Sequence, residues 1–179
     1  YRSYTLMNVR QSQFQALVEA YSADLYRFAY WLVRDRTLAE DLVQESFLRA
    51  WKALDSLRDP KAAKSWLITI LRRERARHYE RAPPPDDSLE EMDLDRIAGF
   101  EDSHGRTEHI ALRRALSGLS EDYREPLLLQ VLGGYTCEEI GELLELSPGA
   151  VMTRLSRARQ KLRHCLEEDD NQRTREIAL

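Results

Sequence analysis

The sequence predicts an all-α protein of two small helical domains joined by a flexible acidic linker. Apolar residues recur at helical spacing through most of the chain, helix-start patterns precede these stripes, and the composition changes near residue 83. A chain of 179 residues is long enough for two such domains, each with a thin core. The expected parts are an N-terminal extension (1–11), a helical domain (12–82), the linker (83–107), a helix-turn-helix domain (108–166) and a tail without helical periodicity (167–179).

Two helices are expected at the start of the first domain. Ser12 with Gln15 forms a capping-box pattern that indicates where the first begins, and Thr37 with Glu40 repeats this pattern before the second. Apolar residues then follow at a spacing that places them on one helix face. They are Phe14, Leu17, Val18, Tyr21, Leu25, Phe28 and Leu32 in the first helix, and Leu38, Leu42, Val43, Phe47, Leu48 and Trp51 in the second.

A third helix is expected after a break at residues 55–60. The break contains the dipeptide Asp59-Pro60, and a residue that precedes proline resists the helical conformation. Helical spacing resumes at Trp66, Leu67, Ile70 and Leu71, and this stripe runs out in arginines. Three antiparallel helices of this kind are expected to pack as a small bundle.

The linker prediction rests on composition. Residues 83–107 begin with three prolines and hold eight acidic residues against two arginines, which is typical of an extended, solvated segment. Periodicity then resumes with Ile110, Leu112, Leu116 and Leu119. Ser120 is expected to cap the following helix, which Pro126 should kink or shorten.

Residues 135–166 fit a helix-turn-helix. Thr136 with Glu139 forms another capping box, and Ser147 with Pro148 supplies an N-cap and a first-turn proline for the second helix. We expect Gly141 to allow a close crossing of the two helices. The first helix should turn Ile140, Leu143 and Leu144 inward, with Leu146 in the turn, and the second should bury Val151, Leu155, Ala158 and Leu162.

The polar side of that second helix predicts DNA binding. No acidic residue occurs between Ser147 and Leu166. Thr153, Ser156 and Arg157 should point away from the core, flanked by Arg154, Arg159, Lys161 and Arg163. Early polar residues that reach base edges and arginines that contact phosphates or guanine are typical of a helix in the major groove. The alternative is a helical hairpin with a solvated basic face.

The first domain carries two further charged surfaces. A loop with Arg58, Lys61 and Lys64 precedes a helix that places arginines beside His78 and Tyr79: Arg72, Arg73, Arg75, Arg77 and Arg81. Cations beside aromatic rings suit single-stranded DNA, although a basic helix end can simply be solvated. Asp41, Gln44 and Glu45 share one helix face; this acidic-polar patch suits a protein partner, or is a plain solvated face.

Composition and missing motifs narrow the function classes. A net charge of −4 argues against coating DNA by bulk electrostatics. No apolar run approaches the roughly 18 residues of a membrane span, and no signal peptide opens the chain, so we expect a cytoplasmic protein without membrane insertion. Cys137 and Cys165 lack metal-ligand spacing and are expected to be reduced thiols. Neither a phosphate-binding loop nor a placed nucleophile is present, so neither enzymatic activity nor a cofactor is expected.

Three segments together resemble the extracytoplasmic-function (ECF, group IV) sigma factors of the sigma-70 family. They are AEDLVQESFLRAWKAL, SWLITILRRERA and YTCEEIGELLELSPGAVMTRLSRARQKL, in the family's order and separated by the expected linker. The resemblance covers nearly the whole chain from about Phe14 to Leu166. It implies a non-enzymatic factor that binds RNA polymerase core enzyme and directs it to promoter DNA. The helix-turn-helix alone would also suit many other regulators.

The resemblance also assigns roles to residues. It implies that Asp41, Gln44 and Glu45 dock on the polymerase beta-prime clamp, with the beta subunit as a further partner. For the minus-ten element, whose base would be flipped into the loop 55–64, it implies Arg58, Lys61, Lys64, Trp66, Arg72, Arg73 and Arg75. For the minus-thirty-five element it implies Ser147, Gly149, Ala150, Thr153, Arg154, Ser156 and Arg157. The acidic linker would thread through the polymerase, and an anti-sigma factor would hold the protein inactive.

The sequence departs from the family pattern at two positions. Met152 stands where Lys or Arg is usual, and Pro126 interrupts a helix that is normally continuous. The main alternative is a stand-alone helix-turn-helix regulator that binds its operator as a dimer. Such a regulator would bind duplex DNA unaided, whereas a sigma factor should bind promoters tightly only within the polymerase.

Overall fold

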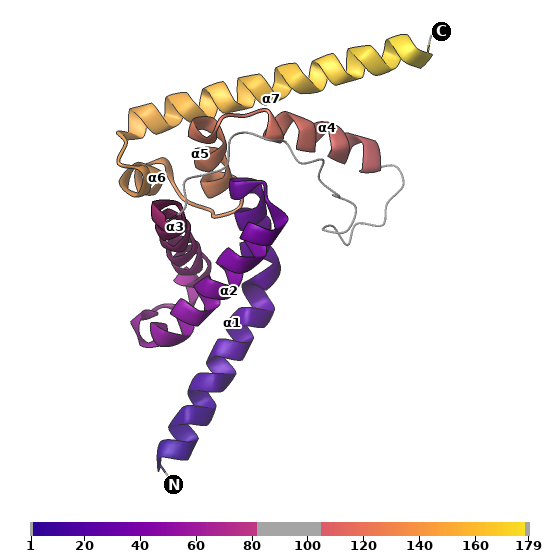
Figure 1. Ribbon diagram of the computed structural model, residues 1–179. Helices are drawn as coiled ribbons and strands as arrows, with labels where there is room; N and C mark the ends of the chain where they lie inside the picture. Colours follow the sequence, from indigo (N-terminus) through magenta and orange to yellow (C-terminus); the bar gives the residue numbers. More distant parts are fainter. Residues whose placement is uncertain (1, 82–104, 178–179) are drawn as a thin grey trace. The chain divides into compact units, whose positions relative to one another are not determined.

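The computed structural model describes residues 2–81 and 105–177, with side chains for residues 8–81, 111–168 and 171. Every regular element in these ranges is a helix, which confirms the predicted fold class. The chain divides into two compact units, one containing α1 to α3 and the other α4 to α7 (Figure 1). The predicted linker lies outside the described residues, except that residues 105–107 already belong to α4.

Helix α1 spans Arg2–Val33 without interruption, so the predicted N-cap at Ser12 is wrong. Residues 2–11 contain neither glycine nor proline, and extending an existing helix is much easier than starting one. The predicted apolar stripe does form the buried face, because Leu25, Phe28 and Leu32 are almost fully inaccessible. Helix α1 therefore begins inside the predicted extension and is longer than expected, because residues 2–11 belong to it.

Helix α2 (Arg36–Lys52) starts one residue before the predicted cap Thr37. Its N-cap is Asp35, whose carboxylate accepts a hydrogen bond from the Leu38 backbone N–H at 2.8 Å. Glu40 does not complete a capping box but forms an ion pair with Arg36 at 2.9 Å. Aspartate and threonine are both good caps, and Asp35 directly follows Arg34, whose positive φ of 57° turns the chain between the two helices.

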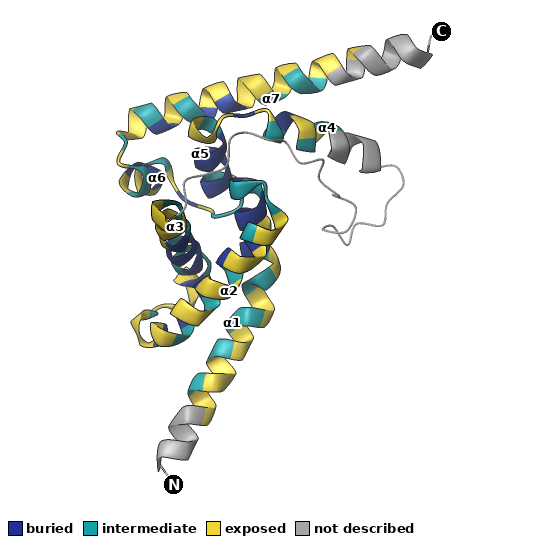
Figure 2. Cartoon of the chain, viewed as in Figure 1, coloured by how far each residue is buried: buried dark blue, intermediate teal, exposed yellow. Residues whose placement is uncertain are grey.

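The predicted break after α2 is confirmed. Two short 3₁₀ helices, η1 (Leu54–Ser56) and η2 (Pro60–Ala62), precede α3 (Ala63–Arg81). Asp59 begins η2 by accepting from the Lys61 N–H at 2.9 Å. The three α-helices pack on one another, and buried residues lie along the sides where they meet (Figure 2). The bundle therefore positions η1 and η2 between α2 and α3, and it includes α3, the helix that carries the basic run.

The second unit contains α4 (Gly105–Ser117), α5 (Glu121–Val131), α6 (Cys137–Leu144) and α7 (Pro148–Ile177). Ser120 directly precedes α5, and its carbonyl accepts from the Arg124 N–H at 2.9 Å. Helix α5 does not end at Pro126 but continues to Val131, with the proline buried. Helix α7 runs to Ile177 and so includes most of the tail 167–179, in which the sequence shows no helical periodicity.

Candidate nucleic-acid interface

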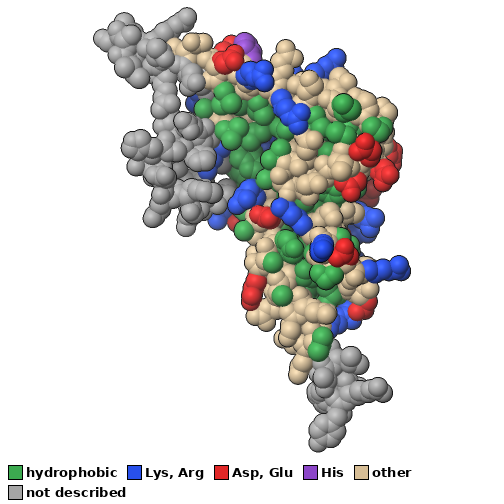
Figure 3. All heavy atoms as spheres, turned by 180° about the vertical axis from the view of Figure 1, so that it is seen from behind, with side chains coloured by type: hydrophobic (Ala, Val, Ile, Leu, Met, Phe, Trp, Pro, Cys, Tyr) green, Lys and Arg blue, Asp and Glu red, His purple; other side chains and the backbone are tan. Residues whose placement is uncertain are grey.

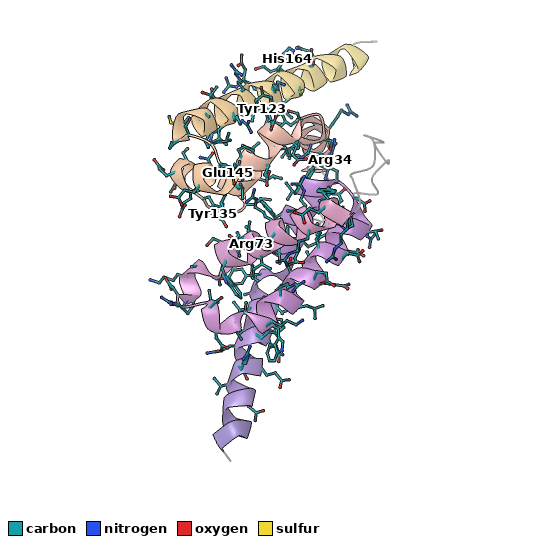
Figure 4. All side chains as sticks on the ribbon, turned by 60° about the vertical axis from the view of Figure 1, so that its left-hand side comes forward. Arg34, Arg73, Tyr123, Tyr135, Glu145 and His164 are labelled. Atoms are coloured by element: carbon teal, nitrogen blue, oxygen red, sulfur yellow. The ribbon has the colours of Figure 1, made fainter. Side chains whose placement is uncertain are left out.

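A sharp turn joins α6 to α7. The predicted capping box is confirmed: the Thr136 hydroxyl accepts from the Glu139 N–H at 3.2 Å, and the Glu139 carboxylate accepts from the Thr136 N–H at 2.8 Å. At the other end Glu145, labelled in Figure 4, adopts a left-handed conformation with φ of 56°. The Leu146 N–H then donates to the Gly141 carbonyl at 2.8 Å. These local contacts fix the geometry of the turn.

Gly141 is required by the turn itself. A Cβ atom at this position would lie 2.6 Å from the backbone oxygen of Leu146, and 3.7 Å from the nitrogen of Pro148. The sequence predicted a close approach by the second helix. The closest atom belongs to the turn, and the second helix approaches with its first residue, Pro148. The sequence predicted that Gly141 must be small. It did not predict that the Leu146 carbonyl is the group that approaches, because that position depends on the left-handed conformation of Glu145.

Helix α7 starts as predicted and buries the predicted face. Pro148 is its first residue, and the Ser147 hydroxyl accepts from the Ala150 N–H at 3.2 Å. The stripe that was expected inside is buried at Val151, Leu155 and Ala158 and half-buried at Leu162.

The opposite side of α7 faces solvent. Ser147, Gly149, Thr153, Ser156 and Arg157 are exposed, and Ala150 is half-buried. The Thr153 hydroxyl donates to the Gly149 carbonyl at 3.0 Å, which leaves its oxygen lone pairs available. A short run of polar groups thus begins at the first turn of a firmly capped helix, as a helix that enters a major groove requires.

Some predicted cations of α7 are held by α5. Arg154 forms an ion pair with Asp122 at 3.2 Å, Arg159 donates to Gln130, and Lys161 lies 4.5 Å from the ring centroid of Tyr123, which Figure 4 labels. These partners were not predicted, because they belong to α5. In the sequence, α6 and two connecting segments lie between α5 and α7. Arg157 is fully on the solvent side, whereas Arg154 is half-buried.

Helix α3 contains two acidic residues within its basic run, Glu74 and Glu80, and only Glu74 is buried. Glu74 is only 8% exposed; it pairs with Arg49 of α2 at 3.3 Å and with Arg77 one turn further along α3. The pattern of arginines along the helix did not predict the role of this carboxylate. The Glu74 carboxylate neutralises part of the positive charge of the basic run and links α3 to α2 through its ion pair with Arg49.

Replacing Glu74 by glutamine is expected to lower the free energy of unfolding of the first unit by about 1–2 kcal/mol. The loss is smaller than for a fully buried pair. Both arginine partners are 46% exposed, so water solvates their charges when the carboxylate is removed. Denaturant unfolding of the variant measures the effect. Glu80→Gln, an exposed position on the same helix, is the control, and equal stability of the two variants would contradict the role of Glu74.

The remaining candidates in the first unit lie on α3 and on the segment before it. Arg58, Lys61 and Arg73 are exposed, and Trp66 and Arg72 are half-buried. Arg75 stacks over the ring of Tyr79 at 4.9 Å. Lys64 forms an ion pair with Asp24 of α1 at 2.9 Å. The structure thus gathers these side chains along one loop and one helix of the first unit, while the exposed polar side of α7 belongs to the second.

The acidic-polar patch lies on the solvent side of α2. Asp41, Gln44 and Glu45 are all exposed, while Leu42 and Ser46 on the same helix are buried. Figure 3 shows acidic and basic side chains close together over much of the surface in that view, with several acidic side chains gathered at its right-hand edge. Leu48, which was expected on the buried face of this helix, follows the patch by one turn and is 57% exposed.

Burial raises the pKa of the Tyr26 hydroxyl above its usual value, and the carboxylate of Glu40 raises it further while Arg36 lowers it. Tyr26 therefore stays neutral at neutral pH.

Within residues 2–81 and 105–177, no helix combines the length and apolarity of a membrane span.

Two family descriptions match the chain: sigma-70 region 2 over residues 17–82, and sigma-70 region 4 over residues 109–162. The chain is 32% identical to the ECF RNA polymerase sigma factor EcfG of Rhodopseudomonas palustris, over 81% of this chain and 80% of that protein. It is 33% identical to the probable RNA polymerase sigma factor RfaY of Xanthomonas campestris, where 86% of this chain matches 40% of the relative's length.

Two solved structures share the arrangement of helices. The sigma factor RpoE of Bartonella quintana, in complex with the anti-sigma factor NepR, matches with a TM-score of 0.59 and 26% identity, over 88% of this chain and 96% of that one. CnrH in complex with the cytosolic domain of CnrY matches with a TM-score of 0.58 and 27% identity, over 89% and 90%. The chain is thus similar to sigma factors along both of its units.

Proposed function

The chain belongs to the extracytoplasmic-function sigma factors of the sigma-70 family, and we propose that it directs RNA polymerase core enzyme to promoters as a group IV member. Members of this family are DNA-binding initiation factors, so its role is recognition and not catalysis. It acts where the polymerase acts, in the cytoplasm. The domains are residues 12–82 for the minus-ten element and 108–166 for the minus-thirty-five element, joined by the linker 83–107.

The observation that carries this function is the exposed polar side of α7. Thr153, Ser156 and Arg157 project from the first turns of a helix whose start is fixed by Ser147 and by the turn after α6. We assign minus-thirty-five contacts to these residues and to Ser147, Gly149, Ala150 and Arg154. Exposed hydroxyls and a guanidinium at the start of such a helix are suited to base edges and phosphates.

The minus-ten contacts are assigned to the first unit. Arg58 and Lys61 form an exposed cationic tip, and α3 continues with arginines beside Tyr79. Cationic groups that follow a backbone, together with aromatic rings, bind separated strands through phosphates and stacking. The full assignment is Arg58, Lys61, Lys64, Trp66, Arg72, Arg73 and Arg75.

Two protein partners complete the proposal. The exposed patch of Asp41, Gln44 and Glu45 docks on the beta-prime clamp of the polymerase core, with beta as a further contact. An anti-sigma factor holds the chain inactive when transcription is not needed; the relatives RpoE and CnrH were both solved with partners, and the former's is an anti-sigma factor. A linker of this composition would allow the two domains to close around such a partner.

Transcription with purified core enzyme tests the function. The chain is added to core polymerase with a library of genomic fragments, and DNA binding by the chain alone is measured in parallel. We expect promoter-specific transcripts that share two spaced elements, and weak duplex binding without core, because the net charge of the chain is negative. Failure to bind core, together with tight operator binding by a dimer, would instead identify a stand-alone helix-turn-helix regulator.

A further inference from the structure

Helix α1 contacts the segment that carries the exposed cationic tip at both of its ends. At the first end, Arg10 of α1 donates to the backbone carbonyl of Trp51 at 2.8 Å and forms an ion pair with Asp55 at 3.2 Å. Its guanidinium also lies 5.2 Å from the centre of the Trp51 ring. The Trp51 carbonyl belongs to the last turn of α2, where carbonyls lack helical partners, so Arg10 caps the end of α2.

Aromatic packing holds this contact in place. The ring of Phe14, one turn along α1 from Arg10, lies edge-on to the rings of Phe47 and Trp51, with centroid distances of 6.2 and 5.1 Å. The packing fixes Trp51 beneath the guanidinium. An exposed ion pair with Asp55 alone would contribute little, but a carbonyl, a carboxylate and a ring together restrict Arg10 to one orientation.

At the second end of the segment, where α3 begins, the contact from α1 is made by Asp24. Its carboxylate pairs with Lys64 in the first turn of α3 at 2.9 Å, and with Arg27 on its own helix at 3.4 Å. Arg10 and Asp24 are fourteen positions apart in the sequence, which corresponds to roughly 21 Å along a helix at about 1.5 Å per residue. One straight helix therefore sets how far apart the two ends of the segment are held.

Between these ends the segment has little support of its own. Leu54 and Ala63 are buried, but all five residues from 58 to 62 are exposed. Hydrogen bonds within the segment are local: the Lys61 N–H donates to the Asp59 carboxylate, and the Leu57 N–H donates to the Leu54 carbonyl. The shape of the exposed part therefore depends on where its ends lie.

We propose that Arg10 and Asp24 are positioning residues that hold the segment 54–64 in the conformation that discriminates between minus-ten sequences. This inference rests on the proposed function, which assigns the segment to the minus-ten element. Neither residue needs to touch DNA. Arg10 fixes the entry to the segment from α2, and Asp24 fixes its exit into α3 and orients Lys64. A loop that holds one unstacked base requires such fixed ends, because selectivity is lost when the pocket can adapt to another base.

The test compares promoters that differ by single bases in the minus-ten element. Transcription by core polymerase with the full chain is measured for Arg10→Gln and Asp24→Asn, on the best promoter and on each single-base derivative. We expect the ratio of best to derivative to fall about fivefold in each variant, as when part of one base-specific contact is lost. Glu19→Gln is the control, since Glu19 is exposed on α1 and its carboxylate accepts from Gln15 of the same helix at 2.9 Å; its ratio should equal the wild type's.

Two results would overturn the inference while leaving the proposed function intact. An unchanged ratio in both variants, with all promoters reduced in proportion, would mean that Arg10 and Asp24 only stabilise the fold. A uniform increase on all promoters with Asp24→Asn would mean that Asp24 merely competes with phosphates for Lys64. The wild type is measured first, and if it directed no promoter-specific transcription, the proposed function would fail together with this inference.

Discussion

Replacing Asp41, Gln44 and Glu45 together by alanine is expected to lower the affinity for polymerase core by roughly a hundredfold and to remove promoter-directed transcription. All three side chains are exposed, and their loss leaves no buried group unpaired. A few residues near the centre of an interface usually dominate its affinity and contribute about 2 kcal/mol or more each, although such contributions are not additive. The measurement is the equilibrium binding of the labelled chain to core, followed by transcription on the strongest promoter.

The control for this triple variant is the double substitution of Glu138 and Glu142 by alanine. Both residues are exposed on α6, so the control removes the same kind of charge from the other unit. Exposed substitutions of this kind usually change stability by less than about 0.5 kcal/mol, so both variants should unfold like the wild type. Unchanged core binding by the triple variant would refute the assignment of the patch and leave the exposed Leu48 as the next surface to test.

The features that sequence alone predicted are those fixed by nearby residues. The capping box of Thr136 and Glu139 and the start of α7 at Ser147 depend on side chains at most three positions from the backbone groups they bond. The start of α2 was misplaced because Asp35 and Thr37 are both good caps within two positions of each other, and only the turn at Arg34 favours the first.

The features that sequence did not predict depend on contacts across the fold. Asp122 and Asp24 each engage a predicted DNA-contacting cation from another helix. Glu74 pairs with Arg77 of the basic run and with Arg49 of α2. A charge pattern along one helix cannot distinguish a free cation from a paired one. In the proposed DNA contacts, Arg154 and Lys64 must exchange or share a carboxylate partner to bind phosphate, whereas Arg157 is already exposed.

Gly141→Ala is expected to lower the free energy of unfolding of the second unit by about 1–2 kcal/mol. Two effects oppose each other. Alanine is favoured over glycine inside a helix by about 1 kcal/mol. The new Cβ, however, would lie 2.6 Å from the Leu146 carbonyl oxygen, a backbone atom that cannot rotate away. Relieving such overlap usually costs about 1–3 kcal/mol, and here it also disturbs the hydrogen bond from the Leu146 N–H to the Gly141 carbonyl.

The effect should be confined to the second unit and should reduce minus-thirty-five recognition, since the turn sets the direction of α7. Amide hydrogen exchange resolves this: protection should fall in α6 and α7 and remain unchanged in α1 to α3. Gly149→Ala is the matched control for stability, because a Cβ there meets nothing within 4 Å. If Gly141→Ala were as stable as Gly149→Ala, the turn would have room to move, and the close approach to Leu146 would not be what requires glycine at this position.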